Sequence, residues 1–155
     1  MNKKNVAVVM GGYSDEYVVS MKSGQLIYDS LDREKYCVYK VVILKDEWYF
    51  LDDHGNKVPM NRADFTAEMS SGYRVKFDVC FNIIHGKPGE NGEMQAYWDI
   101  IGQKYTGCNF YQSALTFNKK DTLAVLSKYG IPSAKSIYLK KGASIDKEKI
   151  VEELG

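Results

Sequence analysis

The stretch "VVMGGYSDEYVVS", Val8–Ser20, decides the fold because an apolar run ends there in two glycines and an acidic turn. The run Val6–Met10 is continuous and β-branched, which is typical of a strand buried on both faces of a sheet. A helical pattern follows over Asp15–Asp32, with Ser14 as the expected N-cap and two carboxylates in the first turn. The stretch therefore predicts a strand, a glycine turn and a helix. One face of that helix carries Val19, Ser23, Leu26, Ile27 and Ser30.

Two further apolar runs predict strands parallel to the first. Tyr36–Leu44 follows the helix in β-α-β order, which implies a right-handed crossover. Phe77–Ile84 is another buried run and leads into the glycine-rich "HGKPGENG", before a helix that Gly102 closes. The aromatic and apolar runs on either side of "DDHGN", Asp52–Asn56, predict an inserted β-hairpin. The predicted fold class is α/β: a Rossmann-like parallel sheet flanked by helices, with an inserted hairpin.

The segment after the second glycine-rich loop predicts the end of one domain and the beginning of another. "KYTG", Lys104–Gly107, is short enough for a brief edge strand. A helix follows, with Asn118 as its N-cap and Gly130 as its C-terminal glycine. The extended segment 131–139 predicts a new strand and entry into a second domain. We place the domain boundary between residues 118 and 119.

Composition and charge exclude several classes of partner. Lys and Arg number 21 against 20 Asp and Glu, which gives a net charge of +1 without a long block of either sign. Nucleic acid and membranes are therefore not expected partners. Three cysteines without a C-x-x-C pairing indicate neither a disulfide framework nor a zinc site. The apolar run Val6–Met10 is too short for a signal peptide, so the cytoplasm is the expected location.

The acidic turn favours an amine over a phosphate. Ligands of parallel sheets bind at the carboxyl ends of the strands, so the first glycine loop, Gly11–Glu16, and the second, His85–Gly92, should border one crevice. A glycine turn before a helix often binds phosphate, but Asp15 and Glu16 already place negative charge there. An ammonium group would instead meet opposite charge. The alternative is that both carboxylates only complement the helix dipole, which contributes about 0.3–1 kcal/mol, and spacing alone leaves both interpretations open.

Three further side chains are candidates for a site. His85 follows a buried strand, in a loop whose glycines let backbone approach a ligand closely, although a solvated or locally hydrogen-bonded histidine is the alternative. His54 lies in the hairpin turn, and we assign it no site role. Lys119 and Lys120 begin a helix, where the dipole disfavours cations unless an anion is bound nearby; a solvated face is the alternative.

Three segments together resemble the D-alanine:D-alanine ligase family of the ATP-grasp superfamily. They are "GGYSDEYVVSMKSG" (residues 11–24), "HGKPGENGEMQ" (85–95) and "YTGCNFYQSALTFNKKDT" (105–122), in the family's order. The second matches the diagnostic pattern H-G-x-x-G-E-[DN]-G-x-x-Q. The resemblance covers nearly the whole chain. It implies a pre-ATP-grasp, substrate-binding N-terminal domain at residues 1–118, followed at 119–155 by the beginning of the ATP-grasp central domain.

The resemblance also implies an activity. Enzymes of this family join two D-alanines through a D-alanyl phosphate, with ATP and magnesium, for peptidoglycan synthesis, and the family resemblance implies a homodimer. Because the family is about twice this length, the magnesium carboxylates and the main ATP-binding residues are expected beyond Gly155, and this chain alone is expected to be inactive. The alternatives are another ATP-grasp ligase, such as a D-alanine:D-lactate ligase, or a non-catalytic Rossmann-like ligand-binding module.

The resemblance assigns roles to four residues near the substrate. Glu16 matches the family glutamate that holds the ammonium of the first D-alanine, and Val19 matches the apolar residue near its methyl group. His85 matches the motif histidine that faces the substrates. Glu90 matches the glutamate that is placed to hydrogen-bond this histidine and fix its orientation.

Three more residues carry implied roles. Ser20 is the motif serine beside the substrate residues, so the implied catalytic set is Glu16, His85 and Ser20. Gly12, with the glycine before it, supplies the tight turn and is counted with the substrate-binding residues. Lys119 matches a lysine that contacts ATP phosphate. Tyr17 and Val18 replace a usually polar pair, and Asn91 replaces the more usual aspartate of the family; none of these departures removes an implied site residue.

Overall fold

The computed structural model describes residues 3–155. The chain divides into two compact units, residues 1–114 and 115–155. This division lies four residues before the domain boundary that the sequence suggests, and the assignment of residues 1–118 and 119–155 to two domains stays a prediction. No helix among the described residues has the length and apolar composition needed to cross a bilayer.

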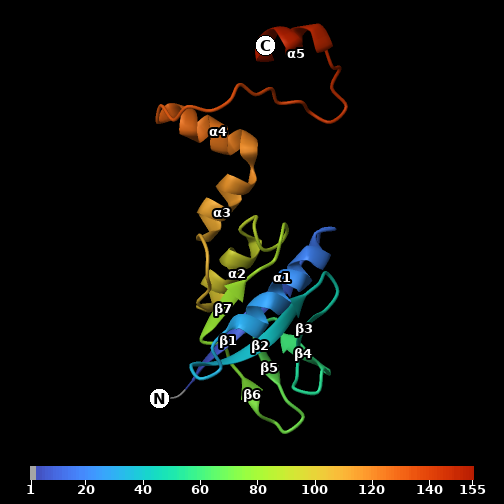
Figure 1. Cartoon of the computed structure of the whole chain (residues 1–155), viewed down its shortest axis with the longest axis vertical. Coiled ribbons are helices and arrows are strands. Elements are labelled where there is room, and N and C mark those ends of the chain that lie inside the picture. Colours follow the sequence, from blue (N-terminus) through green and yellow to red (C-terminus); the bar gives the residue numbers. More distant parts are fainter. Residues whose placement is uncertain (1–2) are drawn as a thin grey trace. The chain divides into compact units, whose positions relative to one another are not determined.

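The first unit is a mixed seven-stranded sheet with helices on both faces (Figure 1). The strand order is β6-β5-β4-β3-β2-β1-β7. β1 is parallel to β2 and to β7, and the other adjacent pairs are antiparallel. The elements are β1 (Lys4–Gly11), α1 (Tyr17–Ser30), β2 (Tyr36–Ile43), β3 (Trp48–Leu51), β4 (Lys57–Asn61), β5 (Thr66–Glu68), β6 (Arg74–Val75), β7 (Val79–Asn82), α2 (Glu93–Ile101) and α3 (Phe110–Phe117), whose last residues belong to the second unit.

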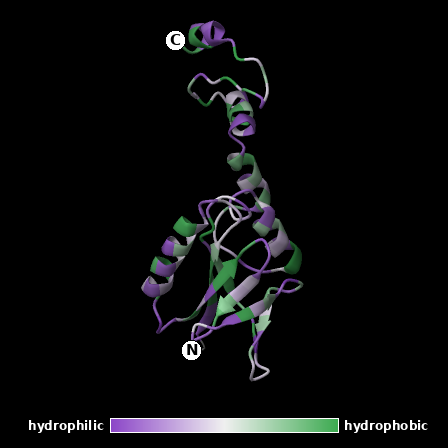
Figure 2. Cartoon of the chain, turned by 90° about the vertical axis from the view of Figure 1, so that its right-hand side faces the viewer, coloured by the Kyte–Doolittle hydropathy of each residue, from purple (hydrophilic) through white to green (hydrophobic). Residues whose placement is uncertain are grey.

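Alternation along β1 builds a hydrophobic core on each face of the sheet. Figure 2 shows that hydrophobic residues are frequent along strands of this sheet. Val8 and Met10 belong to the core under α1. Ala7 and Val9 belong to a larger core that includes Trp98 of α2. Successive side chains of a strand point to opposite faces, and all four β1 residues are at most 1% exposed. The prediction of a central strand buried on both faces is therefore confirmed.

The three predicted parallel strands are confirmed, but the sheet as a whole is mixed. Val6 of β1 lies opposite Val38 of β2 and opposite Val79 of β7. The predicted hairpin forms from β3 and β4, and its turn is held by Asp52, whose carboxylate accepts hydrogen bonds from the side chain and backbone of Asn56. β5 and β6 contain only three and two residues, too few to give a periodic pattern.

The predicted edge strand at Lys104–Gly107 is reduced to one parallel bridge. Tyr105 pairs with Cys80 of β7. The Cys80 N–H donates to the Lys104 carbonyl at 2.8 Å, and the Thr106 N–H donates to the Cys80 carbonyl at 2.9 Å. This bridge lies beside β7, the last strand of the sheet order, so the segment is at an edge of the sheet.

The beginning of α1 differs from the prediction. α1 starts at Tyr17 with Glu16 in the N-cap position, so Ser14 is not the cap and the acidic pair precedes the first turn. The Ser14 hydroxyl donates instead to the His85 carbonyl at 3.2 Å. Ser14 does not cap the helix because its hydroxyl joins the two glycine loops.

The buried face of α1 also differs from the predicted face. Its buried residues are Ser20 and Gly24, four positions apart, whereas Val19 and Leu26 are 52% and 66% exposed. A Cβ on Gly24 would lie 2.7 Å from the side chain of Met10. The helix therefore approaches β1 through its smallest side chains. Of the predicted face, Ile27 packs against the core under α1, whereas Val19 and Leu26 do not.

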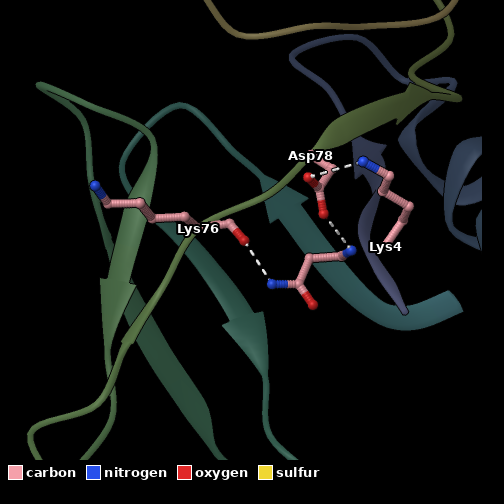
Figure 3. A network of polar contacts seen from close by, with 4 residues as sticks. Lys4, Lys76 and Asp78 are labelled. Carbon is pink, nitrogen blue, oxygen red and sulfur yellow. Dashed lines mark hydrogen bonds and ion pairs between the residues drawn. The ribbon is translucent and has the colours of Figure 1, made fainter. Parts of the chain in front are cut away.

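A polar network joins the beginning of β1 to the segment that leads into β7 (Figure 3). The Asn5 backbone N–H donates to Asp78 Oδ2 and the Asp78 N–H donates to the Asn5 carbonyl, both at 2.8 Å. The Asn5 side-chain amide donates to the Lys76 carbonyl at 2.8 Å, and Lys4 Nζ lies 3.7 Å from Asp78 Oδ1. These contacts hold the amino ends of β1 and β7 together, opposite the two glycine loops.

The second unit contains α4 (Lys119–Lys128) and α5 (Lys147–Leu154). Asn118 is the N-cap of α4, and Gly130, with φ of +68°, follows its last residues, so both predictions are confirmed. The strand predicted at 131–139 is wrong, since these residues form no strand in the part of the chain that the structure describes. A strand needs a ladder partner, and neither α4 nor α5 can provide one.

Candidate functional site

The two glycine loops meet at the carboxyl ends of β1 and β7. The Tyr13 N–H donates to the Lys87 carbonyl at 2.7 Å, and the Ser14 hydroxyl donates to the His85 carbonyl. These bonds confirm that both loops open at the same edge of the sheet. Gly12 allows this approach, because its φ is +114° and a Cβ there would lie 2.9 Å from the Ile84 side chain.

The Glu16 carboxylate lies against the second loop at Gly86. Glu16 Oε2 would lie 3.2 Å from a Cβ on Gly86, whose φ is +70°. The Gly86 N–H donates to Glu90 Oε2 at 2.8 Å. Two carboxylates therefore flank one glycine, and the Glu16 and Glu90 residues are exposed. Their combined negative potential favours a bound cation such as an ammonium group.

Asp15 has different surroundings from its neighbour Glu16. It borders a pocket of about 340 Å³ at the end of β2, lined by Gly12, Tyr13, Ser14, Asp15, Tyr17, Leu44 and Lys45. Lys45 lines the same pocket as Asp15. The two carboxylates of the turn are thus distinct, and Asp15 offers a matched control for Glu16.

His85 is half-buried, and its Nε2 atom is buried without a hydrogen-bond partner among the described residues. Among residues 3–155 the structure shows no hydrogen bond between the Glu90 carboxylate and this imidazole; Glu90 Oε2 accepts instead from the Gly86 backbone N–H. Glu90 therefore shapes the loop beside His85. A buried imidazole nitrogen without a partner is a group that a ligand could satisfy.

Ser20 connects α1 to the carboxyl ends of β1 and β7. Its hydroxyl accepts from the Gly11 N–H at 2.9 Å and donates to the Ile83 carbonyl at 2.7 Å. Ser20 is 0% exposed. In this structure its hydroxyl is enclosed and already bonded, so Ser20 holds the two loops in place and does not face a ligand.

Val19 and two contacts that the sequence did not indicate complete the site. Val19 lies in the first turn of α1, is exposed, and is close in sequence to Glu16. The Ser14 bridge and the side chain of Asn82, which donates to the Gly89 carbonyl at 2.8 Å, were both missed. An asparagine inside the apolar run Phe77–Ile84 is the one sequence signal for the second contact.

Lys119 belongs to the second unit, where it is the first residue of α4. Lys119 and Lys120 line a pocket of about 470 Å³ within this unit, together with Leu123, Ala124, Ser127, Ser133, Ser136, Ile137 and Tyr138. Two ammonium groups and several hydroxyls suit an anion such as a phosphate. Among residues 3–155, no three His, Cys, Asp or Glu side chains lie together as a metal ion would require.

We predict that Asn118→Ala destabilises α4 selectively. Asn118 Oδ1 accepts from the Asp121 N–H at 3.3 Å, and none of the residues of α4 is buried, so the cap contributes much of its stability. The expected loss is about 1 kcal/mol, measured as faster amide exchange in α4. Asp146→Ala, which removes the N-cap of α5, is the matched control. Equal loss of protection in both helices from either variant would contradict the assignment.

Comparison with known proteins places the chain in a family. Residues 5–108 match the family model described as D-ala D-ala ligase N-terminus. A D-alanine--D-alanine ligase of Flavobacterium psychrophilum is 57% identical over 151 residues, which are 97% of this chain and 45% of that protein. The chain therefore belongs to the D-alanine--D-alanine ligase family, and it spans about half the length of the curated relatives it matches.

Solved structures agree with this assignment. The D-alanine-D-alanine ligase of Coxiella burnetii has a TM-score of 0.86 at 26% identity, over 97% of this chain and 50% of that one. The VanG D-Ala:D-Ser ligase of Enterococcus faecalis has a TM-score of 0.73 at 28% identity, over 86% of this chain and 44% of that one. The same fold thus occurs in ligases that are named for different second substrates.

Proposed function

We propose that this chain forms the substrate-binding N-terminal part of an ATP-dependent ligase that joins two D-alanines through a D-alanyl phosphate for peptidoglycan synthesis. The observation that carries the proposal is the placement of two carboxylates, Glu16 and Glu90, around Gly86, beside the unpartnered Nε2 of His85. An amino acid offers both an ammonium group for such carboxylates and polar groups for such a nitrogen.

Each candidate site residue named below has its own proposed role. Glu16 binds the ammonium group of the first D-alanine, and exposed Val19 contacts its methyl group. His85 faces the substrates through Nε2. Glu90 fixes the Gly86 backbone next to them, and Gly12 permits the close contact of the two loops. With the ammonium group held, the carboxylate of this D-alanine is the group that accepts phosphate from ATP, and the amine of the second D-alanine then displaces that phosphate.

ATP and magnesium are proposed to be bound mainly by residues beyond this chain. Lys119 is the proposed contact to ATP phosphate, which is supported by its position with Lys120 in one pocket. The ammonium groups there can neutralise phosphate charge. Magnesium would supply further neutralisation of the phosphates, and we expect its carboxylate ligands after Gly155, as the family resemblance implies.

Several properties of the whole protein belong to the same proposal. A cytoplasmic homodimer without nucleic-acid or membrane partners is what the family resemblance and the composition suggest. The second substrate is open to D-lactate or another D-amino acid, because the fold is shared with a D-Ala:D-Ser ligase. The proposed site residues of this chain concern the first D-alanine, which these alternatives have in common.

The experiment uses a chimaera in which residues 1–155 are joined to the C-terminal portion of the Flavobacterium psychrophilum ligase. The chimaera is expected to release phosphate from ATP when D-alanine is present, and the 155-residue chain alone is expected to release none. The unmodified Flavobacterium enzyme is the positive control. A folded chimaera that releases no phosphate would contradict the proposed function. Phosphate release by the 155-residue chain alone would contradict the proposal that the main ATP-binding residues lie beyond it.

A further inference from the structure

Two side-chain amides fasten the second glycine loop at one atom, the carbonyl oxygen of Gly89. Asn82 Nδ2 donates to this oxygen at 2.8 Å from the end of β7. Gln95 Nε2 donates to it at 2.5 Å from α2. A carbonyl oxygen has two lone pairs, so it can accept both bonds at once. The loop is therefore attached at the same point to a strand and to a helix.

Asn82 also fixes the beginning of the loop. Its Oδ1 atom accepts from the Ile84 N–H at 3.3 Å, so one side chain bonds both to the residue directly before His85 and to Gly89. Gly89 packs so closely on the Ile84 side chain that a Cβ would overlap it. The backbone path through His85 is thus fixed before this residue, at Ile84, and after it, at Gly89.

Gln95 is buried, but it stabilises the fold less than its burial suggests. It is 3% exposed, and its Oε1 atom is buried without a partner among the described residues. A buried acceptor without a partner is unfavourable, which offsets the stabilisation from the bond to Gly89. Loss of this side-chain amide should therefore alter the loop more than the overall stability.

We propose that Gln95, acting together with Asn82 through the Gly89 carbonyl, is a positioning residue for His85. Glu90 bonds to the Gly86 backbone and leaves the imidazole Nε2 unheld, so the position of the ring follows from the path of the loop. The inference rests on the proposed function only for the role of His85 toward substrate. The positioning of the His85 ring by Gln95 and Asn82 does not depend on that function.

The test compares ¹⁵N-labelled 155-residue chain with its Gln95→Met variant by NMR. The chain has two histidines, and His54, in the exposed hairpin turn, serves as an internal reference. In the variant the imidazole resonances of His85 should shift while those of His54 stay unchanged. Amide exchange at Gly86 and Glu90, which are both hydrogen-bonded, should become faster by about tenfold. The urea midpoint should change little.

Two further variants make the result decisive. Gln103→Met is the matched control, because Gln103 also donates to a backbone carbonyl, that of Lys104, but beyond the C-terminal end of α2. Asn82→Asp removes the other donor to the Gly89 carbonyl and should shift the same His85 resonances. This variant therefore tests the inference even if Gln95→Met does not fold. Unchanged His85 resonances and unchanged exchange at Gly86 in a folded variant would overturn the inference, as would the same response in Gln103→Met. No activity is measured, so such a failure leaves the proposed function untouched.

Discussion

Glu16→Gln in the chimaera should raise the KM for the first D-alanine by at least about tenfold, with a smaller change in kcat. The carboxylate faces the second loop at Gly86, where a bound ammonium group would form a charge-assisted hydrogen bond. Removing one partner of such a pair costs about 2–5 kcal/mol. Glutamine keeps the shape of the side chain and loses only its charge. Steady-state kinetics with varied D-alanine measures the effect.

Asp15→Asn is the matched control for this variant. Asp15 is the adjacent carboxylate of the same turn, but it borders the pocket that contains Lys45. Its substitution should leave the KM for D-alanine nearly unchanged and alter stability by only about 0.3–1 kcal/mol, the range of helix-dipole effects. Equal and small effects from both variants would indicate that both carboxylates only complement the helix dipole.

Ser20→Ala should lower the free energy of unfolding by about 2–4 kcal/mol, because two buried backbone groups lose their partner. The Gly11 N–H and the Ile83 carbonyl are both bonded to the Ser20 hydroxyl. Urea unfolding of the 155-residue chain, followed by circular dichroism, measures the loss.

Ser30→Ala is the control within the same helix. Ser30 is exposed, and its hydroxyl donates to the Leu26 carbonyl at 2.7 Å, so its substitution should change stability by less than about 0.5 kcal/mol. A loss of that small size for Ser20→Ala would show that its buried hydroxyl does not hold the two loops together.

The three parallel strands were predictable because their sequence signals are long and consistent. Val6–Met10, Tyr36–Leu44 and Phe77–Ile84 are apolar runs that end in glycine loops or loop residues, and all three became the adjacent parallel strands β1, β2 and β7 at one end of the strand order. The N-cap of α4 gave a further reliable signal. Asn118 accepts from a backbone N–H of its own helix, a contact that depends only on local sequence.

The errors in the fold arise where distant contacts override local preference. Ser14 has the sequence of an N-cap, but its hydroxyl is engaged by the His85 carbonyl, 71 residues away. Gly24 marks the buried face of α1 through its close contact with Met10, which no apolar count reveals. Segment 131–139 reads as a strand, yet a strand forms only when another segment pairs with it.

The candidate site was predictable as a meeting of two loops, but its hydrogen bonds were not. Glycines after parallel strands place Glu16 and His85 at one edge of the sheet whatever the details of the turns. The partner of Glu90 depends on the backbone path of the second loop, which the Gly89 carbonyl and its two amide donors define. The enclosure of Ser20 likewise depends on the approach of β7 to α1.

The central claim is that the two loops bind the ammonium group of D-alanine, and an NMR titration of the ¹⁵N-labelled chimaera tests it most directly. D-alanine is added to one sample and propionate, which lacks the ammonium group, to another. The account predicts that the backbone amides of Glu16, Gly86 and Glu90 shift with D-alanine, shift far less with propionate, and lose the response in Glu16→Gln. Equal shifts with both compounds would contradict it. So would a titration in which D-alanine shifts other amides but not those of Glu16, Gly86 and Glu90.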